Sequence, residues 1–179
     1  MPSTAASDDQ PDYGGALGAI PYAFRTSPSR LFRAYVVVAA LFSLVVTLVF
    51  VAALVVLLAR TVGAAGGTFT FSRAFFVAVG FAVVAPTVAP VLLVARRHRR
   101  GQGDARYDAA LALSGYVFLV SLYAGLLISA PPGARDPPPD VLEPVVGTLY
   151  ALPPAFGLVP PVLAIVVMVA VYRVAGDGG

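Results

Sequence analysis

The segment AYVVVAALFSLVVTLVFVAALVVLLA, residues 34–59, is 26 residues long and contains no charged residue. A helix needs about 20 apolar residues to cross the roughly 30 Å hydrocarbon layer of a bilayer. Three further uncharged windows, 74–95, 109–130 and 144–172, are each long enough for the same purpose. Barrel strands are about 9–11 residues long and alternate strictly, whereas these windows are continuous apolar runs. The four windows therefore predict transmembrane helices.

The composition agrees with this interpretation. Hydrophobic residues make up 59% of the 179 residues and charged residues 12%, with a mean hydropathy of +0.86. Soluble domains usually carry about 25% charged residues. We predict an all-α polytopic membrane protein, a bundle of four transmembrane helices with kinked second and fourth spans, the spans covering about 34–59, 74–95, 109–130 and 150–172.

Prolines indicate where the second and fourth spans are expected to bend. Pro86 and Pro90 lie inside the second span, and each removes a helical hydrogen bond, so a kink is expected near Ala82–Pro86. The uncharged stretch 144–172 would be about 43 Å long as one helix, which exceeds the bilayer core. The spacing of Asp140 and Glu143 is that of a capping box and predicts a helix start. We therefore expect an interfacial segment over 140–152, then a fourth span bent at Pro160-Pro161.

The domain organisation follows from the same pattern. Residues 1–24 are predicted to be a disordered cytoplasmic tail, because their early part is rich in Ser, Asp, Gly, Ala and Pro. Residues 25–174 form the transmembrane domain and 175–179 a short C-terminal tail. Ser27-Pro28 is expected to be an N-cap followed by proline at the first helical position.

Arginines predict the orientation. The Lys/Arg bias of short loops sets the topology of a membrane protein. One side of the predicted bundle holds nine arginines, Arg25, Arg30, Arg33, Arg96, Arg97, Arg99, Arg100, Arg106 and Arg173, and the other holds Arg60, Arg73 and Arg135. We therefore expect both termini in the cytoplasm and a location in the cell membrane. All twelve basic residues are arginine, which is typical of a GC-rich prokaryotic genome.

Residues 96–108, RRHRRGQGDARYD, are the most polar stretch and are predicted to be a loop. Its arginines Arg96, Arg97, Arg99 and Arg100 are candidates for contact with anionic lipid headgroups, since juxtamembrane basic residues gain about 1 kcal/mol each near an anionic surface. The alternative is that they only fix the topology. His98 is interpreted as a solvated loop residue. Nucleic acid is not an expected partner, because the cluster is short and lacks interleaved aromatic residues.

Small residues mark a predicted packing face on the third span. Ser121, Gly125 and Ser129 recur at a spacing of four, and such stripes let helix backbones approach closely in lipid. They predict that the third span is the packed centre of the bundle. A homodimer contact through such stripes is the alternative to packing within one chain.

The sequence argues against enzymatic chemistry. There is no cysteine, the four windows hold no Asp, Glu, Lys, Arg or His, and hydrolase, metalloprotease and P-loop signatures are absent. We expect no catalytic residue, metal or cofactor. The predicted function is a non-enzymatic accessory, scaffolding or interaction component, with membrane lipids and a second copy or another membrane protein as partners. The alternative is a passive pathway for ions or small solutes, formed by an oligomer.

Overall fold

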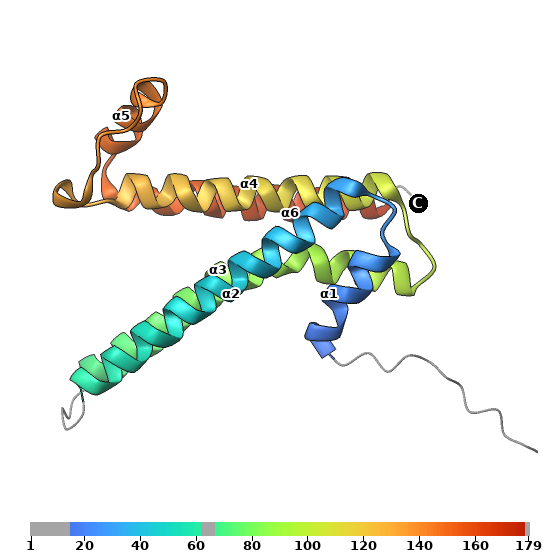
Figure 1. The fold of residues 1–179 in the computed structure, drawn as a ribbon, viewed down its shortest axis with the longest axis horizontal. Coiled ribbons are helices and arrows are strands. Elements are labelled where there is room, and N and C mark those ends of the chain that lie inside the picture. The colour runs from blue at the N-terminus through green and yellow to red at the C-terminus, as the bar shows by residue number, and fades with distance from the viewer. Residues whose placement is uncertain (1–14, 62–66, 178–179) are drawn as a thin grey trace, which may run out of the picture.

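The computed structural model describes residues 15–61 and 67–177 (Figure 1). Every regular element within these residues is a helix. In chain order they are α1 (Gly15–Thr26), α2 (Arg30–Arg60), α3 (Gly67–Arg99), α4 (Ala105–Ser129), the 3₁₀ helix η1 (Pro132–Ala134), α5 (Glu143–Ala151), the 3₁₀ helix η2 (Pro154–Leu158) and α6 (Val159–Asp177).

Four segments of the described chain are long and apolar enough to cross a membrane. They are Arg30–Arg60, Phe71–Arg99, Ala105–Ser129 and Pro154–Ala175, with mean hydropathies between 2.1 and 3.1 in their most apolar windows. The predicted fold class, an all-α protein with four transmembrane helices, is thereby confirmed. The chain is a multi-pass membrane protein.

The helices form two pairs that diverge from a common end (Figure 1). We call this the arginine-rich end: α2 begins there, α3 ends, α4 begins and α6 ends. Buried side chains from α1, α2, α3 and α4 form the main core at this end, among them Phe32, Tyr35, Val94 and Leu111. The α2–α3 pair and the α4–α6 pair then separate toward the far end, where α2 joins α3.

Helix α1 corrects the predicted N-terminal tail. The sequence predicts disorder over 1–24, but Gly15–Thr26 is helical and its Ala19 and Ala23 are fully buried. Both alanines belong to the main core, and Ile20 and Tyr22 of the same helix are partly buried and pack against it. Alanines spaced four apart give α1 a small apolar face, which tertiary packing makes sufficient for order. Residues 1–14 of the predicted tail lie outside the described residues.

The start of α2 lies two residues later than predicted. The N-cap is Ser29, whose Oγ accepts a hydrogen bond from the Phe32 amide, so Arg30 is the first helical residue. Pro28 precedes the cap. The side chain of Ser27 does not cap α2 and instead donates a hydrogen bond to Asp108.

Helix α3 is longer at both ends than the predicted second span. It begins at Gly67, inside the predicted connection 61–73, and it ends at Arg99, inside the predicted loop 96–108. Figure 1 shows α3 running beside α2 and then bending toward α1. Pro86 and Pro90 lie within the helix. The placement of the kink near Ala82–Pro86 stays a prediction.

The fourth span is preceded by a break at Leu152 and Pro153. Helix α5 stops at Ala151, Pro153 precedes η2, and α6 begins at Val159, so Pro160 and Pro161 occupy the first turn of α6. A first-turn amide needs no helical acceptor, and the bend at this proline pair stays a prediction. The predicted capping box is wrong: the N-cap of α5 is Leu142, and no side chain caps it.

Candidate functional site

The centre of the bundle is α4, as its stripe of small residues predicts. Ten of its residues are buried, more than on any other described helix, and it contacts α2, α3, α5, η2 and α6. Ser121 and Gly125 are buried, whereas Ser129 is exposed and donates to the carbonyl of Pro154 at 3.2 Å. Tyr123 is 63% exposed.

Gly125 makes a close approach to the backbone of η2. A Cβ atom built there would lie 2.4 Å from the carbonyl oxygen of Gly157, and one built on Gly157 would collide with the Ser129 hydroxyl. The backbones of α4 and η2 therefore touch without side chains between them. Gly125 and Ser129 act together as an intramolecular contact with the broken start of the fourth span.

A buried carboxylate joins three segments at the arginine-rich end. Asp108, in the first turn of α4, has no exposed surface. Its Oδ2 accepts a hydrogen bond from the Ser27 hydroxyl at 2.5 Å and lies 2.9 Å from Nε2 of His98. The link between α1 and α2, the end of α3 and the start of α4 thus meet at one oxygen atom. Oδ1 of Asp108 has no hydrogen-bond partner.

His98 is the clearest departure from the sequence-based interpretation. It was expected to be solvated among the arginines, but its side chain is only 10% exposed and contacts Asp108. A Cβ atom added to Gly103 would lie 2.7 Å from the His98 ring, so Gly103 lets the loop close over it. The sequence signal available was a histidine and an aspartate on either side of a short glycine loop.

The geometry of the Ser27, Asp108 and His98 cluster differs from that of a serine hydrolase triad. In a serine hydrolase the histidine stands between the serine and the acid and takes the serine proton. Here Ser27 and His98 both address the same oxygen of Asp108, and the Ser27 Oγ also accepts from the Ser29 amide. Burying a carboxylate is costly unless it is paired, so the three contacts stabilise one arrangement of the helix ends.

The four predicted headgroup arginines lie at the same end, on the last turn of α3 and just after it. Arg97 is half-buried, while Arg96, Arg99 and Arg100 are exposed. A pocket of about 210 Å³ brings Arg96, Arg97 and Arg100 together with Arg173 of α6. The structure thus adds Arg173, which is distant in sequence, and leaves Arg99 outside the pocket lining.

Two arginines, Arg73 and Arg135, stabilise the ends of the two helix pairs that lie opposite the arginine-rich end. Nη2 of Arg73 in α3 donates to both the carbonyl and the hydroxyl of Thr61, at 3.2 and 2.6 Å, and so ties α3 to the end of α2. Arg135 reaches the carbonyl of Ala130 and lies 5.0 Å from the ring of Tyr150 in α5. These contacts hold connections at that end.

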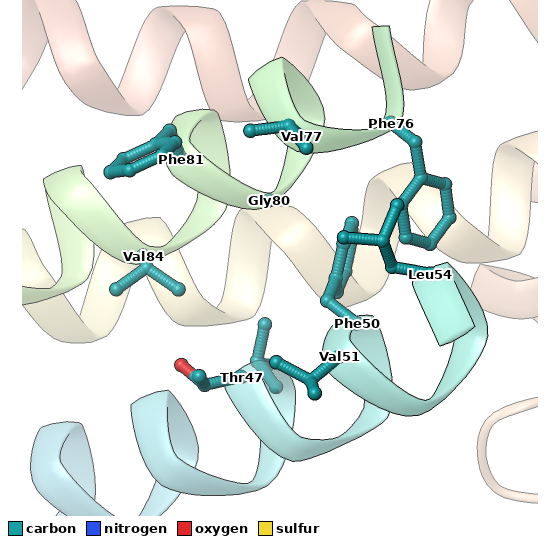
Figure 2. A pocket seen from close by; sticks show the side chains of 10 residues that line it. Thr47, Phe50, Val51, Leu54, Phe76, Val77, Gly80, Phe81 and Val84 are labelled. Atoms are coloured by element: carbon teal, nitrogen blue, oxygen red, sulfur yellow. The ribbon is translucent and has the colours of Figure 1, made fainter. Parts of the chain in front are cut away.

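Between α2 and α3 lies an apolar groove of about 280 Å³. Figure 2 shows Phe50 of α2 directed toward Gly80 of α3, where a Cβ atom would lie 3.0 Å from the phenyl ring. The rings of Phe50 and Phe76 pack with centroids 4.8 Å apart. Thr47 supplies the one hydroxyl group among the lining residues. The other lining residues are apolar.

Within the described residues, no three His, Cys, Asp or Glu side chains gather as metal ligands. The chain belongs to the family described as Domain of unknown function (DUF8056), whose model matches residues 4–176. That match includes all four membrane-spanning helices and the arginine-rich end. No curated protein and no solved structure matches the chain.

Proposed function

We propose that this protein is a non-enzymatic accessory or interaction component of the cell membrane, and that it binds another membrane protein through the α2–α3 pair. The observation that carries the proposal is the contrast between α2 and α4. In the most apolar 18-residue window of α2 no residue is buried, whereas 39% of the corresponding window of α4 is buried. The α2–α3 pair diverges from the rest of the bundle and exposes its faces within the membrane (Figure 1).

The groove between α2 and α3 is the proposed docking position for a partner helix. Close backbone approach and van der Waals packing drive helix association in lipid. Gly80 lowers the floor of the groove, and Phe50, Phe76 and Phe81 shape its walls (Figure 2). Phe81 is 70% exposed, so its ring surface is open to a neighbour. The single Thr47 hydroxyl makes the groove a poor path for ions, which supports an interaction role over a passive pathway.

Photo-crosslinking in native membranes tests this function. A photoreactive residue at Val51, which lines the groove and is 53% exposed, should form a product with a second protein. The same residue at Val166 on α6, 59% exposed, is the matched control and should not. Val51→Trp should then reduce co-purification of that protein severalfold, and Val166→Trp should leave it unchanged. Products with lipid or with a second copy alone would contradict the proposal.

Flux measurements address the alternative pathway directly. Proteoliposomes should show the same leak as empty vesicles for a panel of ions and small neutral solutes. Protein-dependent flux that grows with protein density would favour an oligomeric pore and overturn the accessory role.

The proposed orientation places the arginine-rich end in the cytoplasm, supported by nine arginines there against three at the far end. Single cysteines at Gln102 and Gly133, both exposed, report the two ends. Gly103 is unsuitable because of the His98 ring. An impermeant thiol reagent on intact cells should label Gly133→Cys and should reach Gln102→Cys only after permeabilisation.

A further inference from the structure

The pocket at the arginine-rich end concentrates positive charge from two helices. Arg96, Arg97 and Arg100 come from the end of α3, and Arg173 comes from the end of α6. Leu93, Gln102, Tyr107 and Tyr172 complete the lining, which among the described residues includes no carboxylate. Cations at helix C-termini also offset the helix dipoles, but that role does not require them to share a pocket.

Arg97 links the segments that line the pocket. Its Nε donates to the Gln102 carbonyl at 2.9 Å, its Nη1 donates to the Ala175 carbonyl at 3.1 Å, and its guanidinium lies 4.2 Å from the Tyr107 ring centroid. These contacts hold the last turn of α6 against the end of α3, and thereby bring Arg173 close to Arg96. A guanidinium has five N–H donors, so donors of Arg97 remain for an anion.

An apolar groove continues from this pocket toward the middle of the membrane. It has a volume of about 300 Å³ and lies between α3 and α6, with Ala85, Pro86, Ala89 and Met168 among its lining residues. Leu93 and Tyr172 line both the groove and the arginine pocket. From Leu93 to Ala85 the helix rises roughly 12 Å, a length that accommodates part of an acyl chain.

We propose that the pocket and the groove together bind one anionic phospholipid of the adjacent leaflet. The phosphate lies among Arg96, Arg100 and Arg173, and one acyl chain follows the groove between α3 and α6. The charged-to-apolar order of the lining matches the order of groups in a phospholipid. A soluble phosphate would use the arginines alone and would leave the groove without a role. This inference is independent of the proposed partner interaction.

The headgroup part of the site is tested by lipid binding to the delipidated full-length protein in detergent, followed by native mass spectrometry. Palmitoyl-oleoyl phosphatidylglycerol should bind more tightly than phosphatidylcholine with the same chains. Arg96→Gln with Arg173→Gln should weaken phosphatidylglycerol binding roughly 30-fold, as expected for two lost juxtamembrane charges. Arg30→Gln with Arg106→Gln removes two exposed arginines at the same end, outside the pocket, and should change binding little. Equal weakening by both pairs would overturn the site.

The acyl-chain part is tested by filling the groove. Ala85→Phe should weaken long-chain phosphatidylglycerol binding severalfold but leave dihexanoyl phosphatidylglycerol unaffected. Ala78→Phe, an exposed position on α3 outside the groove lining, is the matched control. Melting curves of all variants verify folding. Full competition by inorganic phosphate, together with no effect of Ala85→Phe, would identify a soluble anion as the ligand and overturn the lipid assignment.

Discussion

The two ends of α2 differ in environment although they belong to one continuous helix. Residues 30–39 contribute Phe32, Tyr35, Val36 and Ala39 to the buried core, whereas no residue from 40 to 60 is buried. Both parts are rich in Val, Leu and Ala, and the apolar residues surround the whole helix. The difference arises from neighbours: α1, α3 and α4 pack around the first part, and α2 leaves α4 beyond it (Figure 1).

This comparison shows how a membrane protein can concentrate its specific packing at one end. In water, an arm with so much exposed apolar surface would aggregate or collapse. In lipid, the exposed surface of α2 is already solvated by hydrocarbon, so divergence costs little. The bundle therefore depends on the arginine-rich end and on the α4–α6 contact for its geometry.

The largest loss of stability is expected from Asp108→Ala. It leaves the buried Ser27 hydroxyl and the His98 ring without their partner, and each buried polar group left unsatisfied costs about 1–3 kcal/mol, so the loss should be about 2–6 kcal/mol. Thermal unfolding in detergent measures the change. Asp104→Ala, which removes an exposed N-cap of α4, should cost about 1 kcal/mol. Equal shifts for the two variants would show that the buried cluster does not hold the end together.

Gly125→Leu should follow, with a loss of about 3 kcal/mol, because its side chain meets the Gly157 backbone. Val120→Leu and Leu126→Ala alter exposed positions on the same helix and should change the melting temperature little. Similar melting shifts for all three would mean that α4 has no distinct packing face.

Leu111→Ala and Leu48→Ala compare the two regions directly. Leu111 is fully buried, and its truncation should cost on the order of 2 kcal/mol, since a cavity remains within protein. Leu48 is 61% exposed on the diverging part of α2, where lipid fills the lost volume. Its truncation should be nearly neutral in chemical unfolding within bicelles. A comparable loss at Leu48 would indicate that this face packs against protein in the membrane.

Tyr35→Phe should have the smallest measurable effect, about 1 kcal/mol. It removes one hydrogen bond, from the Tyr35 hydroxyl to the Thr87 carbonyl at 2.6 Å, while it keeps the edge-to-face contact with Tyr116. Amide hydrogen exchange in α3 near Thr87 should accelerate. Unchanged exchange would show that this hydrogen bond does not contribute to the local stability of α3.

The four spans were predictable because they rest on a single strong constraint. A run of apolar residues in a bilayer must satisfy its backbone internally, so length and charge alone predict the helices. The central position of α4 was also accessible, since Ser121 and Gly125 are small residues at a fixed spacing. In both cases the physical cause acts within one helix.

The candidate site was predictable only in part. Arg96, Arg97 and Arg100 stood out as a charge cluster, but Arg173 joins them through folding, and Arg99 stays outside the lining. The sequence predicts a solvated His98 and includes Asp108 in the loop 96–108, whereas in the structure Asp108 is buried and contacts both His98 and Ser27. No local pattern predicts which polar residues near a membrane surface become covered by another segment.

The number of spans, the asymmetry of arginines between the two ends and the small-residue face of α4 can all be read from the sequence. These properties follow from hydropathy, charge and side-chain size along single helices. Three features depend on tertiary contacts: the folding of Gly15–Thr26 into α1, the burial of Asp108 with His98, and the divergence of the helix pairs. Such contacts also bring Arg173 together with the α3 arginines. Each of these depends on which distant segments meet, and in helices that are apolar all round, periodicity does not specify the meeting face.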